Sequence, residues 1–368
     1  MENKKKKIAF YIGSLDKGGA ERVIVNLAEY FYSQDYEVYV VTKLKEKDEY
    51  SLSPAITRII ADITREEETN SRLGNLYARI RKLRNVWKTI KPDIIVSFIR
   101  KNNVMAIASS RFLKIPVVVS VRSDPKRELQ GRVMKNLSLL LFHFADGIVL
   151  QTSQARDFFP NSLQKKSVIL PNSINPVFLN IEKVTEKSKE IVAVGRIDKN
   201  KNQKMLIDAF SEIAEEYPDW CVRLYGDGEE TSLLKEFVKE KGLQEQVFFM
   251  GQISNVAERI REASIFVLPS KCEGMPNALI EAMTLGVAVI STDCPCGGPA
   301  DLIKDGKNGI LIPVDDQNAL KEALVRLMED TVYRHKLARN AERITEKLHP
   351  DIVNLQWKEY LGTILRKS

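Results

Sequence analysis

The chain has 368 residues, of which 44% are hydrophobic and 29% charged, and it carries a formal net charge of +7. This length favours two domains over a single core, and the composition excludes a disordered or fibrous protein. No run of 18 apolar residues could span a membrane, and the apolar segment near the start is too short for a signal peptide, so we expect a cytoplasmic protein.

Short β-rich runs alternate with helical patterns along the chain, which predicts parallel sheets with crossover helices. The runs in the first half are residues 8–14, 37–42, 57–63, 93–99, 116–122, 146–153 and 167–172. After a polar segment, they resume at residues 191–197, 220–226, 247–251, 265–270, 288–293 and 309–313. We therefore expect an α/β fold with two doubly wound, Rossmann-like domains that face each other across a cleft. In such sheets the loops that follow strands carry the ligand sites.

Two glycines follow the first predicted strand and open a predicted helix. Gly18 and Gly19 leave backbone amides unshielded at the helix N-terminus, and such amides accept an anion or a sugar hydroxyl. A tight turn that needs a flexible backbone would explain the same glycines. Neither this spacing nor that of Gly226 and Gly228 matches the dinucleotide fingerprint, so a nicotinamide dehydrogenase is disfavoured.

Positive charge is concentrated in the first half of the chain. Residues 1–170 hold 30 Lys and Arg against 18 Asp and Glu, whereas the remainder holds 26 against 31. The densest stretch, residues 69–92, contains no acid, and its periodicity predicts an amphipathic helix capped near Ser71. The apolar residues expected to pack are Leu73, Leu76, Tyr77, Ile80, Leu83, Trp87 and Ile90. The cations of the opposite face include Arg79, Lys82, Arg84 and Lys88.

This cationic face has three interpretations. It is a solvated helix surface, or it binds an anionic membrane surface or lipid pyrophosphate, to which each Lys or Arg near the lipid contributes about 1 kcal/mol. The third is nucleic acid, but no aromatic-rich reading motif accompanies the charge, so we expect no nucleic-acid partner.

Cations and carboxylates follow two strands of the second half. VGRIDKNKN (residues 194–202) places Arg196 at the end of a strand and Lys201 at the start of the next helix. Two cations that converge on one crevice fit an anionic partner such as a diphosphate, although each alone is a common surface charge. Metal ligation is not expected, because the four Cys and three His lack the spacing of zinc sites.

CEGMPNALIEAM (residues 272–283) is the most informative stretch. Pro276 suits the first position of a helix, so the amides of the preceding loop point at the helix entrance. Glu281 lies about 7.5 Å further along the helix axis, which matches the reach from a phosphate at the helix tip to a ribose. Glu273, ahead of the tip, would address the group on the other side of the phosphate. Two Glu eight residues apart are common on surface helices, but here they follow a buried strand.

The motifs together resemble the retaining family-4 glycosyltransferases of the two-Rossmann GT-B fold over essentially the full chain. The motifs that carry the resemblance are GGAE at residues 18–21, PNSI at 171–174, VGRIDKNKN at 194–202, YGDGEE at 225–230 and EGMPNALIE at 273–281. The resemblance implies that Arg196 and Lys201 hold the donor diphosphate, that Glu281 binds the ribose and that Glu273 contacts the transferred sugar. It further implies donor contacts from Gly18, Gly19, Gly251, Ile253, Gly274, Met275, Pro276 and Asn277.

The chemistry agrees with these residue types. A nucleotide sugar develops negative charge on its distal phosphate as the anomeric bond stretches, and fixed donors around that phosphate lower the barrier. The sequence has no Asp-x-Asp motif for a metal, so Arg196, Lys201 and helix-tip amides would take the metal's role, without a cofactor. Members of the family commonly carry a His after the strand at 116–122; here that position is Arg122, which can bind a sugar hydroxyl or phosphate but cannot act as a base.

The resemblance also implies a domain organisation. It comprises an acceptor-binding domain over residues 1–172, a linker over 173–190, a nucleotide-sugar-binding domain over 191–350, and a C-terminal helix, 351–368, that crosses back to the first domain. The chain is similar to the branch that extends polyprenyl-diphosphate-linked glycans. We therefore expect a peripheral membrane enzyme that transfers a hexose or N-acetylhexosamine from a UDP-sugar to a lipid-linked glycan, for capsule, exopolysaccharide or glycoprotein synthesis. A soluble-acceptor transferase and a non-catalytic partner subunit, the latter suggested by Arg122, are the alternatives.

Overall fold

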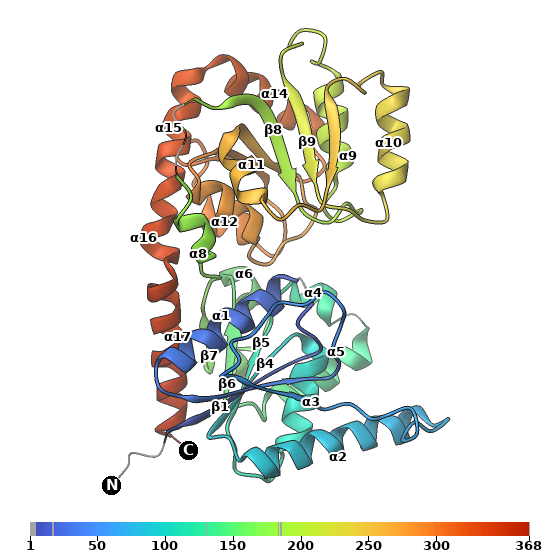
Figure 1. The fold of residues 1–368 in the computed structure, drawn as a ribbon, viewed down its shortest axis with the longest axis vertical. Helices are drawn as coiled ribbons and strands as arrows, with labels where there is room; N and C mark the ends of the chain where they lie inside the picture. The colour runs from blue at the N-terminus through green and yellow to red at the C-terminus, as the bar shows by residue number, and fades with distance from the viewer. Residues whose placement is uncertain (1–4, 17, 130, 183, 185, 368) are drawn as a thin grey trace. The chain divides into compact units, whose positions relative to one another are not determined.

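The structure is a computed structural model and describes residues 5–16, 18–129, 131–182, 184 and 186–367. The chain forms two compact units. Unit 1 contains the described residues up to Pro171 together with the chain from Asp351 onward, and unit 2 is Asn172–Pro350. Each unit is a parallel sheet whose strands alternate with helices (Figure 1). The predicted α/β fold with two doubly wound sheets is confirmed.

Unit 1 has a seven-stranded sheet with the order β3-β2-β1-β4-β5-β6-β7. Its strands are β1 Lys7–Ile12, β2 Glu37–Thr42, β3 Thr57–Ile60, β4 Ile94–Phe98, β5 Val117–Ser120, β6 Gly147–Leu150 and β7 Ser167–Ile169. Every residue of β4, β5 and β6 is buried, because helices cover the sheet. The helices are α1 Gly19–Ser33, α2 Arg72–Ile90, α3 Arg100–Ser110, α4 Pro125–Glu128, α5 Arg132–Phe142, α6 Ser153–Asp157, α7 Asn161–Gln164 and α17 Pro350–Leu365.

The C-terminal helix α17 packs on the sheet of unit 1. The Trp357 ring stacks on Phe98 of β4 with 5.8 Å between the ring centroids. The Tyr360 hydroxyl accepts from the Ile148 N–H and donates to the Lys166 carbonyl, both at 3.1 Å. A segment more than 180 residues away in sequence from unit 1's last strand therefore completes its core.

Unit 2 has a six-stranded sheet with the order β10-β9-β8-β11-β12-β13. Its strands are β8 Ser188–Val194, β9 Cys221–Tyr225, β10 Val247–Gly251, β11 Ala263–Leu268, β12 Ala288–Thr292 and β13 Ile310–Ile312. Its helices are α8 Pro176–Leu179, α9 Gln203–Ser211, α10 Thr231–Glu240, α11 Val256–Glu262, α12 Asn277–Thr284, α13 Gly298–Leu302, α14 Gln317–Glu329, α15 Thr331–Ala341, the 3₁₀ turn η1 Glu342–Ile344 and α16 Thr345–Leu348. The core is aliphatic with the aromatic rings of Phe210 and Trp220.

The segment 173–190, which we expected to be a linker, carries regular structure. Helix α8 lies within it, with Phe178 buried, and β8 begins at Ser188, three residues earlier than the predicted strand. The Ile174 N–H donates to the Leu348 carbonyl at 2.9 Å, so the beginning of this segment is held by the end of unit 2. Apolar periodicity did not reveal β8's start because its first residues are exposed and polar.

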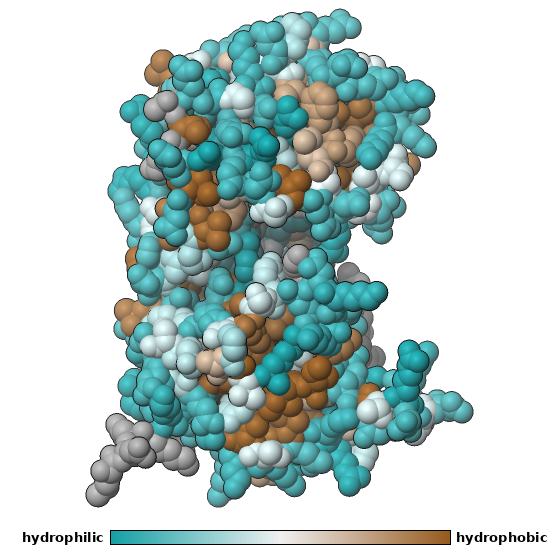
Figure 2. All heavy atoms as spheres, viewed as in Figure 1, coloured by the Kyte–Doolittle hydropathy of each residue, from teal (hydrophilic) through white to brown (hydrophobic). Residues whose placement is uncertain are grey.

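Helix α2 differs from its sequence-based description in its first half. Ser71 caps the helix as predicted, since its hydroxyl accepts from the Gly74 N–H at 3.1 Å. Among the seven apolar residues expected to pack, only the later ones, Leu83, Trp87 and Ile90, are buried, whereas Leu73 is 78% exposed. The first half of α2 extends beyond the sheet (Figure 1), and its side chains of Leu73, Leu76 and Tyr77 are exposed. Figure 2 shows hydrophilic and apolar residues mixed on this projecting end.

Candidate functional site

The strand order marks one crevice in each sheet. In unit 2 the chain runs from β8 through β9 to β10, then returns to the other side of β8 with β11, β12 and β13. Open parallel sheets bind ligands at such a reversal, beyond the carboxyl ends of the two central strands. These strands are β8 and β11 in unit 2, and β1 and β4 in unit 1. The loops after them hold most of the residues singled out from the sequence.

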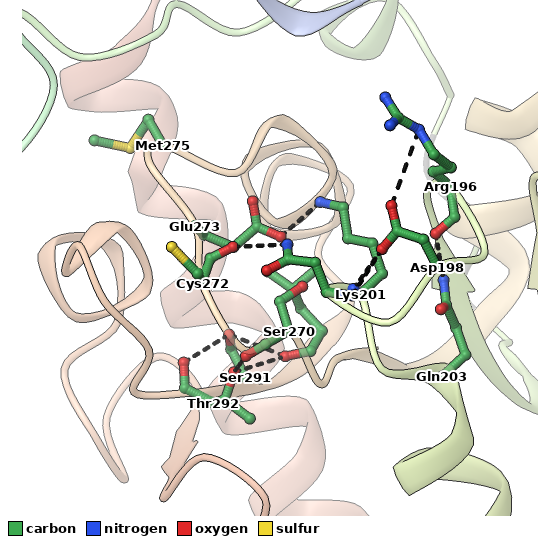
Figure 3. A network of polar contacts seen from close by, with 12 residues as sticks. Arg196, Asp198, Lys201, Gln203, Ser270, Cys272, Glu273, Met275, Ser291 and Thr292 are labelled. Carbon is green, nitrogen blue, oxygen red and sulfur yellow. Dashed lines mark hydrogen bonds and ion pairs between the residues drawn. The ribbon is translucent and has the colours of Figure 1, made fainter. Parts of the chain in front are cut away.

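Arg196 and Lys201 lie in the loop between β8 and α9, which Asp198 shapes. The Asp198 Oδ1 atom accepts from the backbone N–H of Asn200 at 3.0 Å and of Lys201 at 2.8 Å. The side chain of Arg196 is 77% exposed, and its Nε lies 4.0 Å from Asp198 Oδ2 (Figure 3). Such an exposed, long contact contributes little energy, so the guanidinium is available to an incoming anion.

Lys201 and Glu273 join the loops that follow β8 and β11. Lys201 Nζ lies 2.5 Å from Glu273 Oε1, and the two side chains are 26% and 11% exposed (Figure 3). The Glu273 N–H donates to the Pro295 carbonyl at 2.6 Å, and its carbonyl accepts from the Cys296 N–H at 2.8 Å. Burial raises the pKa of the nearby Cys294 thiol to about 12, and the Glu273 charge adds to the rise. The carboxylate is therefore held rigidly, beside a neutral thiol and a cation.

Helix α12 begins at Asn277, one residue later than predicted. Pro276 occupies the capping position, and no side chain caps the helix. The Asn172 Nδ2 atom donates to the Met275 carbonyl at 3.1 Å and to Asn277 Oδ1 at 2.8 Å. Asn172 thereby fixes the loop that leads into α12, a role that the PNSI motif contains but that was not assigned from the sequence. The first N–H groups of α12 form an end that favours an anion.

Two further predicted residues lie around α12. Glu281 is buried in the second turn of the helix. Gly274 packs against Gly298, where a Cβ atom would overlap with the Gly274 carbonyl oxygen. Position 298 therefore requires glycine, and the loop that carries Glu273 is fixed by backbone-to-backbone packing as well as by hydrogen bonds.

The glycines of YGDGEE have a packing role. A Cβ atom at Gly226 or Gly228 would overlap with the carbonyl oxygens of Gly195 or Ile197 in the Arg196 loop. The Gly226 N–H also donates to the Gly251 carbonyl at 2.8 Å. Gly251, with φ +66°, lines a cavity of about 590 Å³ together with the YGDGEE loop, and Ile253 is not among the lining residues.

In unit 1, the glycine loop after β1 meets the start of α1. Gly18 caps the helix without a side-chain hydrogen bond, and Gly19 is its first residue. The Glu21 carboxylate lies against Gly18, where it would overlap with a Cβ atom. Burial raises the pKa of Glu21. A diphosphate that approached these amides would require this carboxylate to move aside or to be protonated.

Arg122 lies two residues beyond β5. Its guanidinium lies 4.7 Å from the centre of the Phe98 ring, and Nη1 is 3.5 Å from the Ser120 hydroxyl. Burial lowers the pKa of Arg122 to about 9, against the opposing effect of Glu128. A pKa of about 9 still leaves Arg122 mainly protonated at neutral pH, so its N–H groups can donate hydrogen bonds. Phe98 is also the ring on which Trp357 stacks, so α17 supports the surroundings of Arg122.

The cationic face of α2 is partly paired within unit 1. Arg79 bonds to Asp62 at 2.9 Å and to Glu68 at 3.1 Å, and Lys82 bonds to Glu67 at 2.9 Å. Arg84 Nη1 donates to the carbonyl oxygens of Ser109 and Arg111 at the end of α3. Lys88 is exposed. The acid-free stretch 69–92 thus meets acids that precede it in sequence, and these pair with two of the four cations predicted for this face, Arg79 and Lys82.

No described helix is both long enough and apolar enough to cross a membrane. Within the described ranges, no group of three or more His, Cys, Asp or Glu is placed to hold a metal ion.

The paired sheets with their loops at the switch points define a GT-B fold. The structure of HepE from Anabaena in complex with UDP-glucose aligns with a TM-score of 0.83 at 20% identity, over 97% of this chain and 99% of that chain. Family models match both units: "Glycosyltransferase Family 4" over residues 17–178 and "Glycosyl transferases group 1" over residues 177–344. The two models together cover most of the chain, which therefore belongs to the glycosyltransferases that they describe and is a glycosyltransferase.

Two curated relatives, both from Campylobacter jejuni, act on lipid-linked glycans according to their names. One is GalNAc-α-(1→4)-GalNAc-α-(1→3)-diNAcBac-PP-undecaprenol α-1,4-N-acetyl-D-galactosaminyltransferase, 26% identical over 97% of this chain and 99% of the relative. The other is N-acetylgalactosamine-N,N'-diacetylbacillosaminyl-diphospho-undecaprenol 4-α-N-acetylgalactosaminyltransferase, 28% identical over 89% of this chain and 92% of the relative.

Proposed function

We propose that the protein is a retaining, metal-independent glycosyltransferase that moves a hexose or N-acetylhexosamine from a UDP-sugar to a lipid-linked glycan. The observation that carries the proposal is the ion pair between Lys201 and Glu273, which joins two loops at the switch point of unit 2. The loop between β8 and α9 carries Arg196 and Lys201, and the loop that leads into α12 carries Glu273. The relatives named for undecaprenyl-linked acceptors support the acceptor class, and the fold neighbour that binds UDP-glucose supports the donor class.

The cations stabilise the departing nucleoside diphosphate. As the bond between the anomeric carbon and the diphosphate oxygen breaks, negative charge grows on the distal phosphate. Arg196 and Lys201 place two positive charges there, and the N–H groups at the start of α12 add oriented dipoles. In other enzymes, the removal of one such preorganised donor costs about 10²–10³ in rate. These side chains take the role that a metal held by Asp-x-Asp plays in other glycosyltransferases.

The remaining residues orient the donor. Glu281, in the second turn of α12, is assigned to the ribose hydroxyls, and Glu273, held by its backbone and by Lys201, to hydroxyls of the transferred sugar. The acceptor hydroxyl attacks the anomeric carbon on the face from which the diphosphate leaves. Its proton passes to a departing phosphate oxygen, so no carboxylate nucleophile is needed. Arg122 donates to a sugar hydroxyl or phosphate.

Unit 1 is assigned to the acceptor and to contacts from Gly18 and Gly19 to the donor phosphates. A lipid-linked acceptor would place the enzyme peripherally at the cytoplasmic membrane surface. The names of the Campylobacter relatives support this assignment. A soluble acceptor is the alternative outcome of the experiment below.

The experiment is a transfer assay with the purified full chain. UDP-hexoses, UDP-N-acetylhexosamines and GDP-sugars are first compared for protection against thermal unfolding, since a ligand at about 100 times its Kd stabilises by about 2.7 kcal/mol. The protective donor is then incubated with a polyprenyl-diphosphate-linked glycan and with the same glycan without lipid. We expect a UDP-sugar, an α-linked product by NMR coupling constants, and unchanged turnover in chelator. Loss of turnover in chelator, or a β-linked product, would contradict the proposal.

A further inference from the structure

Unit 1 exposes a group of apolar side chains on the loop between α3 and β5, on α5 and on the turn that follows α5. The side chain of Phe112 is 85% exposed, and Leu137, Leu140 and Phe144 are exposed as well. The Arg111 guanidinium lies 5.0 Å from the centre of the Phe112 ring and 4.3 Å from that of Phe144, so the two rings flank one cation. We call this surface the loop–α5 patch; it consists of Arg111, Phe112, Lys114, Leu137, Leu140 and Phe144.

The backbone of the loop is held in an unfavourable conformation that presents Phe112 to solvent. Phe112 has φ +66° and Lys114 has φ +55°, and both values lie in a region of backbone conformation that residues other than glycine, asparagine and aspartate rarely adopt. Arg84 of α2 holds the start of the loop through hydrogen bonds from its Nη1 atom to the Ser109 and Arg111 carbonyls. Strain of this kind persists where the surrounding structure enforces it, and it points to a functional site.

The charge around the patch is positive. A cavity of about 400 Å³ opens beside it, with Arg111, Phe112, Lys114 and Phe144 in its lining. Among the described residues that line this cavity, Asp146 is the acidic one, and its Oδ2 atom already accepts a hydrogen bond from the Val117 N–H at 2.8 Å. Arg111 and Lys114 are both exposed. Protruding aromatic and aliphatic side chains with cations between them match what binds the boundary between lipid head groups and acyl chains.

We propose that the loop–α5 patch docks unit 1 onto an anionic lipid bilayer. Phe112, Leu140 and Phe144 enter the interface, and Arg111 and Lys114 contact lipid phosphates. The inference rests on the proposed function to the extent that a lipid-linked acceptor places the enzyme at a membrane. A second copy of the chain fits less well, because a two-fold contact would set the same cations against each other.

The patch lies away from the predicted catalytic residues within unit 1. The loop precedes β5, whereas Arg122 follows it, and four residues of strand span ~13 Å. Changes in the patch therefore test membrane binding without touching a residue assigned to the donor or the reaction.

The experiment measures sedimentation of the full chain with vesicles. Vesicles of phosphatidylglycerol and phosphatidylcholine in equal parts are compared with vesicles of phosphatidylcholine alone, at low and high salt. We expect binding to the anionic vesicles that weakens in salt. Phe112→Ser is expected to lower the partition coefficient more than tenfold, since full burial of a Phe side chain is worth about 1.5–3 kcal/mol. Lys114→Gln is expected to lower it about fivefold.

Matched controls lie in unit 2. Val332→Ser removes a side chain that is 79% exposed, and Lys239→Gln removes an exposed cation from α10; both are expected to bind vesicles as the wild type does. Equal binding by Phe112→Ser and the wild type would overturn the proposal. So would a concentration-dependent dimer, seen by light scattering, that Phe112→Ser abolishes.

The outcome is separable from that of the proposed function. If the chain transfers sugar to lipid-free glycan but does not sediment with vesicles, the docking surface is refuted and the assignment as a transferase still holds. A chain that binds anionic vesicles through Phe112 and Lys114 but transfers no sugar supports the docking surface and refutes the assigned reaction.

Discussion

Replacing Lys201 by methionine removes the cation that faces Glu273 while keeping a side chain of similar length. Removal of one partner of a fully buried ion pair costs about 3–5 kcal/mol, and of an exposed pair about 0–1 kcal/mol. With side-chain exposures of 26% and 11%, this pair lies between the two limits. We expect Lys201→Met to destabilise the protein by about 2–3 kcal/mol, because Glu273 is left partly buried without its counter-ion.

The assay is thermal unfolding of the apo protein together with initial rates of transfer. For a unit of this size the loss corresponds to about 4–12 °C in Tm. The matched control is Lys204→Met, which breaks an exposed pair with Asp208 one turn further along α9 and is expected to change Tm by no more than about 4 °C.

The double variant Lys201→Met with Glu273→Gln separates stability from function. It has no uncompensated carboxylate, so most of the lost stability returns, whereas transfer stays at least about 100-fold reduced. Two results would refute this reasoning: a Tm for Lys201→Met equal to that of Lys204→Met, or a double variant as unstable as the sum of the two single changes.

Three further predictions follow from contacts in the two units. Asn172→Ala removes two hydrogen bonds to the loop before α12 and should lower kcat/KM about tenfold with a small change in Tm; unchanged kcat/KM would show that this loop needs no such support. Gly226 has φ +126°, and a Cβ atom there would overlap with the Gly195 carbonyl, so Gly226→Ala should destabilise the protein by about 2–5 kcal/mol in urea unfolding. Gly242 has φ +69° and no atom within 4 Å of such a Cβ, so Gly242→Ala should cost only about 1–2 kcal/mol. Equal losses in the two variants would contradict this account of the packing. The hydrogen bond from Arg58 lowers the pKa of Glu49 to about 2 from 4.5. The contribution of this pair to the free energy of unfolding is therefore complete above about pH 4.5 and disappears as the pH falls toward 2. Arg58→Met should flatten this part of the stability–pH curve, and an unaltered curve would exclude the pair as the cause of the pH dependence.

The sequence was most informative where local pattern and topology act together. Buried parallel strands appear as continuous apolar runs, and the order of such strands sends the loops after β8 and β11 to one edge of the sheet. Arg196, Lys201 and Glu273 could be grouped for that reason. Their pairing could not be predicted, because the contact between Lys201 and Glu273 spans 72 residues and depends on how each loop is fixed by Asp198 and by Pro295.

Other features were out of reach of periodicity and composition. The spacing in α2 identifies an apolar stripe, but it does not show how far the helix extends beyond the sheet, so Leu73 was wrongly expected to pack. The cations of α2 were counted within residues 69–92, whereas Asp62, Glu67 and Glu68, which pair with Arg79 and Lys82, precede that stretch. The positive φ of Phe112 has no signature in the sequence, because it is imposed by the connection from α3 to β5.

The most direct test of the account is the transfer rate of Arg196→Ala at saturating acceptor, relative to wild type. Its guanidinium is exposed and weakly held, so the substitution should leave the Tm of the apo protein unchanged. If this cation stabilises the departing diphosphate, kcat/KM for the nucleotide sugar falls about 10²–10³-fold. A variant that transfers sugar as fast as the wild type would show that the anion is held elsewhere and that the assigned site is wrong.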